Sequence, residues 1–392
     1  MQLRTLAQTS VDEKTILLRA DFNVPLKNGE VQDKTRLVES LPTIQFLLEK
    51  GAKVVLCSHL GRPKGQVMEE LRLDAVGFEL SKLLGKPVLK LNDCIGPEVL
   101  TAISAVPFGT VLLLENLRFH PEEEANDAAF AAALAEGKDL YVSDAFGTVH
   151  RAHASTVGVT KYLPSYAGFL VQKEVDVLSG ILEHPKKPVA LVVGGAKIDT
   201  KIGILEKFLD IADVFVIGGA LANTFLLAQG YSIGTSLCEV EKVEVAKRFL
   251  ATAAGKTVLL PTDVVVAADI TPGLPTQEVA VNAVPAGQKI LDLGTQTRAA
   301  FADALASVAT VLWNGPMGLY EVESFAAGTR ELAEALAELP AVKVIGGGDT
   351  IDALTHFGVP IEKFTHISTG GGAMLEFLEG KMLPGVEALL AQ

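Results

Sequence analysis

The sequence is poor in cysteine and in aromatic residues. Its 392 residues include three cysteines and one tryptophan, and the aromatic content is 6%. Cys57, Cys94 and Cys238 form an odd set with neither metal-ligand nor redox spacing. The ordinary interpretation is that they are buried free thiols in a reducing compartment.

Positive charge and long apolar runs are also scarce. The chain has 34 Lys and Arg against 47 Asp and Glu, a formal net charge of −13, which argues against a nucleic-acid or membrane-surface binder. No run approaches the roughly 18 apolar residues of a membrane span, and the N-terminus lacks an apolar signal region. We therefore expect a cytoplasmic protein. Any anion site must be formed by local positive charge, because the chain as a whole is negatively charged.

Familiar catalytic motifs are missing. The two glycine runs near the end of the chain have Ile351 and Leu375 where G-x-G-x-x-G requires its last glycine, and Gly255-Lys-Thr has Leu250 where a P-loop requires its first. Neither G-x-S-x-G nor H-E-x-x-H occurs. A dinucleotide dehydrogenase and a P-loop enzyme are thus disfavoured, and an acyl hydrolase or zinc peptidase has no support.

What the chain does contain is an alternation of short apolar runs with amphipathic helical patterns. In the first half the runs are 15–18, 53–56, 110–114 and 140–142, with helical patterns such as 36–50 and 127–135 between them. Strands that alternate with helices indicate βαβ units, and hence a parallel sheet with helices on both faces. The predicted fold class is α/β, and the length suggests two domains or three.

Arginine or histidine follows each of these four runs. The residues are Arg19; His59 and Arg62; Arg118 and His120; and His150, Arg151 and His153. Ligands of such sheets bind outside the carboxyl ends of the strands. One such residue is most simply a surface ion pair, but four groups in an acidic protein indicate a receptor for a small, multiply anionic molecule, because arginine binds phosphate and carboxylate bidentately.

The best domain boundary is a short polar stretch that holds two prolines, His184-Pro-Lys-Lys-Pro188. It follows a helical pattern at 172–182, which we interpret as a connecting helix. The predicted organisation is a first domain at 1–171, a connecting helix and hinge at 172–188, a second domain at 189–374 and a terminal segment at 375–392.

In the second half, glycine takes the place of arginine at the strand ends. The central example is an apolar run that ends in Gly194-Gly195 and leads into a helical pattern carrying Lys197 and Lys201. Glycine allows close approach of the backbone, and two lysines beside a helix N-terminus suit a polyanion. Each glycine run alone is more simply a sterically required turn. Since such runs also follow the strands before 218, 314, 346 and 370, a nucleotide-binding domain is favoured.

The chain resembles phosphoglycerate kinase over essentially its whole length. The stretches that carry the resemblance, in order, are Arg19-Ala-Asp-Phe-Asn-Val-Pro, Ser58-His-Leu-Gly-Arg-Pro, Glu115-Asn-Leu-Arg-Phe-His-Pro, Asp144-Ala-Phe-Gly-Thr-Val-His-Arg-Ala-His, Gly194-Gly-Ala-Lys, Trp313-Asn-Gly-Pro, Gly346-Gly-Gly-Asp-Thr and Thr369-Gly-Gly-Gly-Ala. The resemblance implies two doubly wound, Rossmann-like domains that face each other across a cleft, in a monomer. It also implies reversible transfer of the γ-phosphoryl group of MgATP to the carboxylate of 3-phosphoglycerate, which yields 1,3-bisphosphoglycerate and ADP.

The same resemblance implies a role for each of a set of residues. Phosphoglycerate would be held by Asp21, Asn23, Arg36, His59, Arg62, Arg118 and Arg151. Catalysis would involve Arg36, Lys197, Gly371 and Gly372, with Arg36 and Lys197 flanking the phosphoryl group in flight. The nucleotide would be held by Lys201, Gly218, Gly219, Gly294, Glu321, Gly347, Gly348, Asp349 and Thr350. Of these, Glu321 would take the ribose hydroxyls, Asp349 would hold Mg²⁺, and Gly218, Gly219 and Gly294 would line the adenine side. The segment at 375–392 would pack back on the first domain.

Alternatives from other classes explain less of the sequence. An NAD-linked dehydrogenase lacks its glycine fingerprint. A non-catalytic sugar-phosphate binding protein accounts for the arginines but leaves Lys197, Asp349 and the glycine runs without a use. One departure from the family pattern is Met374, where a small residue is expected, and it puts no catalytic role in doubt.

Overall fold

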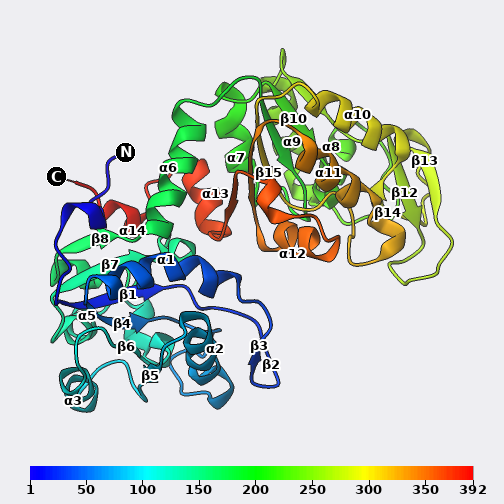
Figure 1. Ribbon diagram of the computed structural model, residues 1–392. Helices are drawn as coiled ribbons and strands as arrows, with labels where there is room; N and C mark the ends of the chain where they lie inside the picture. Colours follow the sequence, from blue (N-terminus) through cyan, green and yellow to red (C-terminus); the bar gives the residue numbers. More distant parts are fainter. Residues whose placement is uncertain (392) are drawn as a thin grey trace. The chain divides into compact units, whose positions relative to one another are not determined.

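A computed structural model describes residues 1–391. The chain forms two compact units: an N-terminal unit (Met1–Asp176 with Met382–Gln392) and a C-terminal unit (Val177–Lys381). The division between 176 and 177 falls inside helix α6 (Phe169–Glu183), which joins the two units (Figure 1). The domain boundaries expected from the sequence lie after residues 171, 188 and 374. The expected connector, 172–188, therefore covers most of α6 and the turn that follows it.

The N-terminal unit contains a six-stranded parallel sheet with the order β5-β6-β4-β1-β7-β8. Its strands are β1 (Thr15–Ala20), β4 (Lys53–Cys57), β5 (Val88–Lys90), β6 (Val111–Leu113), β7 (Leu140–Asp144) and β8 (Ser165–Ala167), and a separate hairpin pairs β2 (Leu26–Lys27) with β3 (Glu30–Val31). The four predicted apolar runs are confirmed as β1, β4, β6 and β7. They are the four central strands of the sheet.

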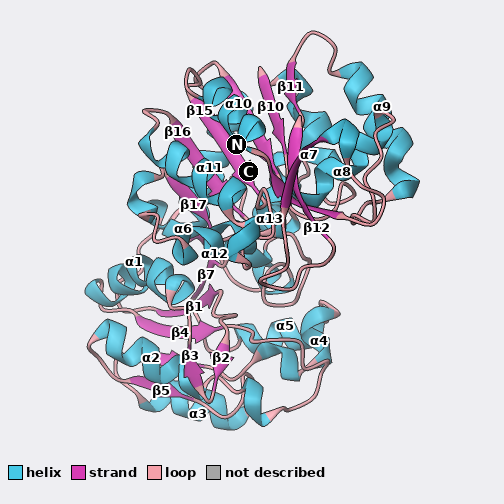
Figure 2. Ribbon diagram, turned by 90° about the vertical axis from the view of Figure 1, so that its right-hand side faces the viewer, coloured by secondary structure: helices cyan, strands magenta, loops and turns pink. Residues whose placement is uncertain are grey.

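Helices cover both faces of this sheet (Figure 2). The helices of the unit are α1 (Thr35–Glu49), α2 (Asp74–Leu84), α3 (Pro97–Ala105), α4 (Pro121–Glu124), α5 (Ala128–Ala135) and α14 (Pro384–Glu387), with 3₁₀ turns η1 (Leu6–Gln8), η2 (Glu69–Leu71), η3 (Leu117–Phe119), η4 (Phe146–Thr148) and η5 (Gly158–Lys161). Side chains alternate along β1: Ile16 and Leu18 join the core that α1 and α2 complete, and Leu17 joins the core of α3 and α5. This is the predicted doubly wound arrangement.

The two ends of the chain lie side by side in the N-terminal unit. Leu3 forms an antiparallel bridge with Leu390, and the backbone N–H of Arg4 donates to the carbonyl of Leu389 (2.8 Å). Gly385 donates to the carbonyl of Val149 (2.8 Å). The segment from 382 onward therefore belongs to this unit, whereas residues 375–381 remain in the C-terminal unit.

The C-terminal unit contains a second six-stranded parallel sheet, with the order β11-β10-β9-β15-β16-β17. Its strands are β9 (Val189–Val193), β10 (Val214–Ile217), β11 (Thr257–Leu259), β15 (Thr310–Asn314), β16 (Val342–Gly346) and β17 (His366–Ser368). A small antiparallel sheet, β13-β12-β14, joins β12 (Asp263–Ala267) to β13 (Gln277–Ala280) and β14 (Lys289–Leu293). The small sheet was not predicted.

The helices of this unit follow the expected alternation. They are α7 (Ile202–Lys207), α8 (Gly219–Ala228), α9 (Val243–Thr252), α10 (Thr295–Leu305), α11 (Ala327–Glu338), α12 (Gly348–His356) and α13 (Gly372–Leu378), with 3₁₀ turns η6 (Phe208–Asp210), η7 (Val240–Lys242), η8 (Val281–Ala283), η9 (Glu323–Phe325) and η10 (Ile361–Lys363). Val192, Trp313 and Ile345 form one core with α10, α11 and α12. The prediction of two doubly wound α/β domains is thus confirmed.

Each sheet has a switch point, where strand order reverses and ligands of such folds bind. In the N-terminal unit it lies between β1 and β7, and in the C-terminal unit between β9 and β15. Within residues 1–391, no helix has the length and apolarity that crossing a membrane requires.

Candidate active site

The N-terminal switch point is built around Arg19, a buried arginine at the end of β1 that is 1% exposed. Its Nε donates to Oγ of Ser155 (2.9 Å), and its Nη1 donates to the carbonyl of Ala20. Ser155 in turn donates to Glu123 from Oγ (2.6 Å) and from its backbone N–H (2.9 Å). Arg19 therefore faces inward and holds neighbouring groups in place, which its position after an apolar run did not reveal.

His59, at the end of β4, is held by this arginine. Nη2 of Arg19 lies 3.2 Å from Nδ1 of His59. Because a guanidinium can only donate, Nδ1 must accept, so the ring proton is on Nε2. Burial, followed by the charges of Arg19, Arg118, Arg36 and Arg151, holds the pKa of His59 well below its usual value. His59 is therefore a neutral hydrogen-bond donor surrounded by four cations.

The loops after β1 and β4 bring three more of the predicted residues together. Arg36, in the first turn of α1, forms an ion pair with Asp21 and keeps a third of its side chain exposed. Asp21 also accepts from the backbone N–H of Asn23 (3.1 Å), and the side chain of Asn23 accepts from Gly61 (2.9 Å). One short network thus joins Asp21, Asn23 and Arg36 to the loop that follows His59.

The remaining predicted arginines differ in burial. Arg118 is 5% exposed; it donates to the carbonyl of Gly61 (2.8 Å) and its Nε lies 3.2 Å from Glu124. Burial is the main reason that its pKa lies below the usual value. Arg151 is half-buried and donates to Nε2 of His150 (3.1 Å), whereas Arg62 is exposed. Cations outnumber their carboxylate partners here, so the cluster suits a multiply charged anion.

The C-terminal unit has a cavity of about 530 Å³ at its switch point. Three of the predicted nucleotide residues line it: Gly219, Glu321 and Asp349. Much of the remaining wall is apolar, with Leu237, Ile270, Leu291, Pro316 and Met317 among its residues. An apolar slot with a few polar groups at its rim suits a flat heterocycle attached to a polar tail.

Backbone segments pack against one another beside this cavity. Gly219 has φ +64°, and a Cβ there would lie 2.7 Å from the backbone nitrogen of Gly195. Gly315 has φ +99°, and a Cβ there would lie 2.4 Å from the carbonyl oxygen of Gly194. The loops after β9, β10 and β15 therefore meet at distances that leave no room for side chains.

The two predicted lysines are in different environments. Lys201 donates from Nζ to Oδ1 of Asn314, and burial lowers its pKa to about 8, although Asp349 and Glu379 act in the opposite direction. Lys197 is exposed on the loop after β9. Asn314, which also donates to the carbonyl of Gly346 (2.8 Å), was not assigned a role from the sequence.

The last two glycine runs begin helices, as the sequence indicated. Gly347 (φ +98°) precedes α12, and Gly371 (φ +50°) precedes α13. As at the start of any α-helix, the first N–H groups have no acceptor within the helix and can bind an anion. Gly348 and Gly372 are exposed first residues of these helices. Thr350 is buried, and its Oγ1 accepts from the backbone N–H of Gly315 (2.7 Å), so its side chain fixes a loop.

Two predicted adenine-side glycines do not line the cavity. A Cβ on Gly218 would lie 2.4 Å from Sδ of Met317, and one on Gly294 would lie 2.3 Å from the carboxyl carbon of Asp263. Close packing of a neighbouring side chain explains both. The unexpected Met374 has a similar explanation: its Sδ would lie 2.2 Å from a Cβ on Gly346, so methionine fills space that the glycine leaves.

Sequence reasoning missed Asp292, a buried carboxylate of β14 that lines the cavity. It accepts from the backbone N–H of Gly328 (3.0 Å) at the start of α11. Burial raises the pKa of Asp292 to about 7, although these hydrogen bonds oppose the shift. An aspartate inside the apolar run Lys289-Ile-Leu-Asp-Leu was the available signal.

One unit thus presents a cluster of cations and the other an apolar cavity beside lysines and helix N-termini. On two doubly wound sheets, these features define a phosphotransferase that uses a nucleotide and a small anion. A family model described as "Phosphoglycerate kinase" matches residues 6–381. The chain belongs to the phosphoglycerate kinase family.

Relatives and solved structures agree with this assignment. The chain is 54% identical over 387 residues to a phosphoglycerate kinase of Moorella thermoacetica, with 98% of each chain covered. It is 51% identical over 392 residues to one of Pelotomaculum thermopropionicum, which is covered completely. The fold is similar to that of the Coxiella burnetii phosphoglycerate kinase (TM-score 0.87, 42% identity, 99% and 98% covered) and of the Pyrococcus horikoshii enzyme (0.88, 33%, 99% and 98%). The prediction of a kinase is confirmed, and a non-catalytic binding protein is not favoured.

Proposed function

We propose that this chain catalyses reversible transfer of the γ-phosphoryl group between MgATP and the carboxylate of 3-phosphoglycerate, with 1,3-bisphosphoglycerate and ADP as the other pair. The observation that carries the proposal is the cluster of arginines around a neutral His59. Phosphoglycerate would be held by Asp21, Asn23, Arg36, His59, Arg62, Arg118 and Arg151. In this arrangement Nε2–H of His59 donates to the anion and the arginines cancel its charge.

The acceptor needs no general base. A carboxylate has a reference pKa of roughly 4 and is already ionised at neutral pH. The main obstacle is repulsion, since two like charges about 4 Å apart repel by roughly 4 kcal/mol at an effective dielectric near 20. Arg36 and Lys197 would flank the transferred group and cancel this charge, and the free N–H groups at Gly371 and Gly372 would hold its oxygens.

The nucleotide would occupy the cavity of the C-terminal unit. We assign to it Lys201, Gly218, Gly219, Gly294, Glu321, Gly347, Gly348, Asp349 and Thr350. Glu321 is exposed on the cavity wall, where it would accept from the ribose hydroxyls. Gly218 and Gly294 would act only by letting neighbouring side chains pack behind the cavity.

Asp349 is the residue we propose for Mg²⁺. Its exposed carboxylate lies in the first turn of α12 and lines the cavity, and oxygen donors are the ligands that Mg²⁺ prefers. A bound Mg²⁺ would neutralise charge on the nucleotide phosphates. Asp349 would hold the ion in place, and Lys201, with its Nζ beside Asn314, would keep a positive charge next to it.

The two substrates must meet with water excluded, or ATP and the acyl phosphate would hydrolyse. We propose that the 172–188 connector acts as the hinge for this closure, between a phosphoglycerate domain at 1–171 and a nucleotide domain at 189–374. A monomer in the cytoplasm, with no nucleic-acid or membrane partner, completes the proposal.

The test is a coupled assay of the purified protein with 3-phosphoglycerate and MgATP, beside a Lys197→Ala variant. We expect Mg²⁺-dependent turnover that falls by orders of magnitude in the variant, while calorimetry shows unchanged phosphoglycerate affinity. Tight phosphoglycerate binding without turnover in the unaltered chain would instead favour the sugar-phosphate binding protein.

A further inference from the structure

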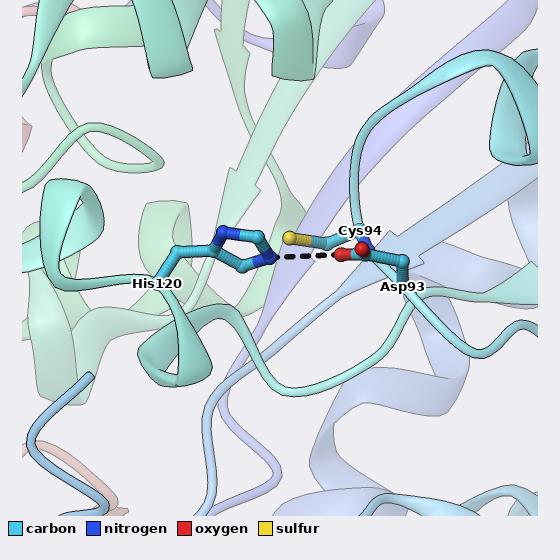
Figure 3. Close-up of side chains that lie close together, drawn as sticks. All are labelled: Asp93, Cys94 and His120. Atoms are coloured by element: carbon cyan, nitrogen blue, oxygen red, sulfur yellow. Dashed lines mark hydrogen bonds and ion pairs between the residues drawn. The ribbon is translucent and has the colours of Figure 1, made fainter. Parts of the chain in front are cut away.

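His120 belongs to the set of basic residues at the strand ends, yet its side chain is committed elsewhere. It follows η3, and its Nε2 lies 2.8 Å from Oδ1 of Asp93, on the loop between β5 and α3. The thiol of Cys94 lies beside the same ring (Figure 3). One ligand atom from each of Asp93, Cys94 and His120 can be chosen so that all three lie within 4.8 Å of one another. The phosphoryl-transfer mechanism uses none of the three.

The three groups have the chemistry of a metal site. Zn²⁺ binds thiolate, imidazole and carboxylate at roughly 2.0–2.3 Å, so tetrahedral ligands are separated by roughly 3.4–3.8 Å. Nε2 of His120 lies 2.8 Å from Oδ1 of Asp93, and the three ligand atoms lie within 4.8 Å of one another, limits that bracket these separations. Mg²⁺ and Ca²⁺ are unsuitable, because both prefer an all-oxygen set.

Access and rigidity also favour a cation here. Cys94 is fully buried, whereas the side chains of Asp93 and His120 are 51% and 28% exposed. The thiol thus forms the floor of a site that is open on the carboxylate and imidazole side. The backbone N–H of Cys94 donates to Oδ1 of Asp93 (2.6 Å), which orients the carboxylate. Solvent would complete the coordination, as in zinc sites with three protein ligands.

We propose that Asp93, Cys94 and His120 bind one Zn²⁺ ion. The ion would join two loops of the N-terminal unit whose ligands are 27 residues apart. Since Arg118 lies two residues before His120, the bound ion would fix the turn that positions this substrate arginine. The three ligands are separate from the residues proposed to bind phosphoglycerate, the nucleotide and Mg²⁺.

The first test is calorimetric titration of the nucleotide-free full chain with zinc chloride. We expect one Zn²⁺ per chain, with an affinity that falls at least roughly tenfold in Cys94→Ser and in His120→Asn. Cys238→Ser and Asp349→Asn should bind as the unaltered chain does, because the first removes an unrelated thiol and the second the carboxylate proposed for Mg²⁺. Equal binding by the unaltered chain and Cys94→Ser, or loss of binding in Asp349→Asn, would overturn the proposal.

A spectroscopic test does not depend on the variants folding well. Co²⁺ added to the unaltered chain should give the intense near-ultraviolet band of sulfur-to-cobalt charge transfer, together with visible bands typical of tetrahedral coordination. Zn²⁺ should displace both. Absence of the charge-transfer band, or a band that survives Cys94→Ser, would exclude Cys94 as a ligand and overturn the assignment. An unchanged far-ultraviolet circular dichroism spectrum and urea midpoint of metal-free Cys94→Ser would show that this variant is folded.

Discussion

At the switch point of the N-terminal unit the strands end in charged side chains, whereas in the C-terminal unit they end in glycine. In the N-terminal unit, Arg19 is 1% exposed. It donates to Ser155 and lies beside Nδ1 of His59. In the C-terminal unit, Gly219 and Gly315 have positive φ and touch the backbone of neighbouring loops. Both sheets are parallel and six-stranded, but they differ in strand order as well as in the residues that end their strands.

The contrast shows how one fold presents two kinds of anion site. A small anion offers little surface, so recognition depends on charge, and the side chains that supply it must be held by a buried network. A nucleotide offers a large surface, and close backbone approach with an apolar wall recognises its shape. We therefore expect charge substitutions in the N-terminal unit to have larger effects than steric ones in the C-terminal unit.

The largest effect is expected from Arg36→Ala. The substitution removes a cation next to the proposed acceptor carboxylate and leaves Asp21 unpaired. We expect kcat to fall by roughly 100- to 1,000-fold, the range typical of losing one group that stabilises charge in the transition state. The matched control is Arg330→Ala, whose ion pair with the exposed Glu323 lies outside both sites; this variant should keep kcat within about twofold. Equal kcat values for the two variants would contradict the idea that the N-terminal unit recognises its anion through charge.

Among effects on stability, rather than on turnover, the largest is expected from Arg19→Met. Glu123, which Ser155 links to Arg19, would remain buried without its main opposite charge, and an uncompensated buried charge costs about 3–5 kcal/mol. We expect urea unfolding, followed by circular dichroism, to shift to lower urea concentration. Trp313 is the one tryptophan and is buried in the C-terminal unit, so its fluorescence should report a smaller shift. A second change, Glu123→Gln, should restore part of the loss; a further loss would contradict the pairing.

The third prediction concerns Asp144, which, like Asp292 in the other unit, is a buried aspartate with a raised pKa. Asp144, the last residue of β7, is fully buried and accepts from the backbone N–H groups of Leu170 (2.8 Å) and Val171 (3.3 Å) at the start of α6. Burial, the largest cause, raises its pKa to about 7 from the ordinary value of 3.8. The folded state therefore holds a proton that the unfolded state releases. Its contribution to stability is complete below about pH 4 and is lost as pH rises to about 7.

The pH dependence is checked by measuring the free energy of unfolding from pH 4 to 8 for the unaltered chain and for Asp144→Asn. Their difference should change by at most about 4 kcal/mol, since one pKa unit corresponds to about 1.4 kcal/mol. As the pH rises, the free energy of unfolding of the unaltered chain should fall relative to that of Asp144→Asn. A difference that grows in its favour with pH would mean that Asp144 is ionised and stabilises the helix N-terminus as an anion.

The central strands of both sheets could be predicted from the sequence because they are buried on both faces and so form continuous apolar runs. Edge strands β5 and β8 could not, since each includes a polar residue, Lys90 or Ser165, and neither forms a continuous apolar run like that of β6. The small sheet β13-β12-β14 was missed because its strands alternate with no helices, and the parallel interpretation had no place for it. These failures concern short or antiparallel elements, where neighbours rather than local sequence decide the structure.

For the site, residue type at strand ends was informative, but side-chain direction was not. Arg19 and His120 satisfy the same pattern as Arg118, yet Arg19 faces Ser155 and His120 faces Asp93. Likewise, Gly294 resembles a ligand-binding glycine, although packing against Asp263 is enough to require it. Sequence position fixes which edge of the sheet a residue reaches; only packing decides where its side chain points.

The smallest effect is expected from Gly219→Ala, and it tests the backbone half of the comparison. The new Cβ would lie 2.7 Å from the nitrogen of Gly195, so the loops beside the cavity must separate. Overpacking of this kind costs about 1–3 kcal/mol, so we expect nucleotide affinity, measured by calorimetry, to fall roughly ten- to a hundredfold with phosphoglycerate affinity unchanged.

The control is Gly255→Ala. Gly255 has φ +92°, but a Cβ there would have nothing within 4 Å. Both variants place alanine at a positive φ, but only the one at Gly219 brings its Cβ against neighbouring backbone, at Gly195 and at the carbonyl of Pro316. Equal nucleotide affinity in the two would mean that this site, too, depends on side-chain charge, and that the two units differ less than their loops suggest.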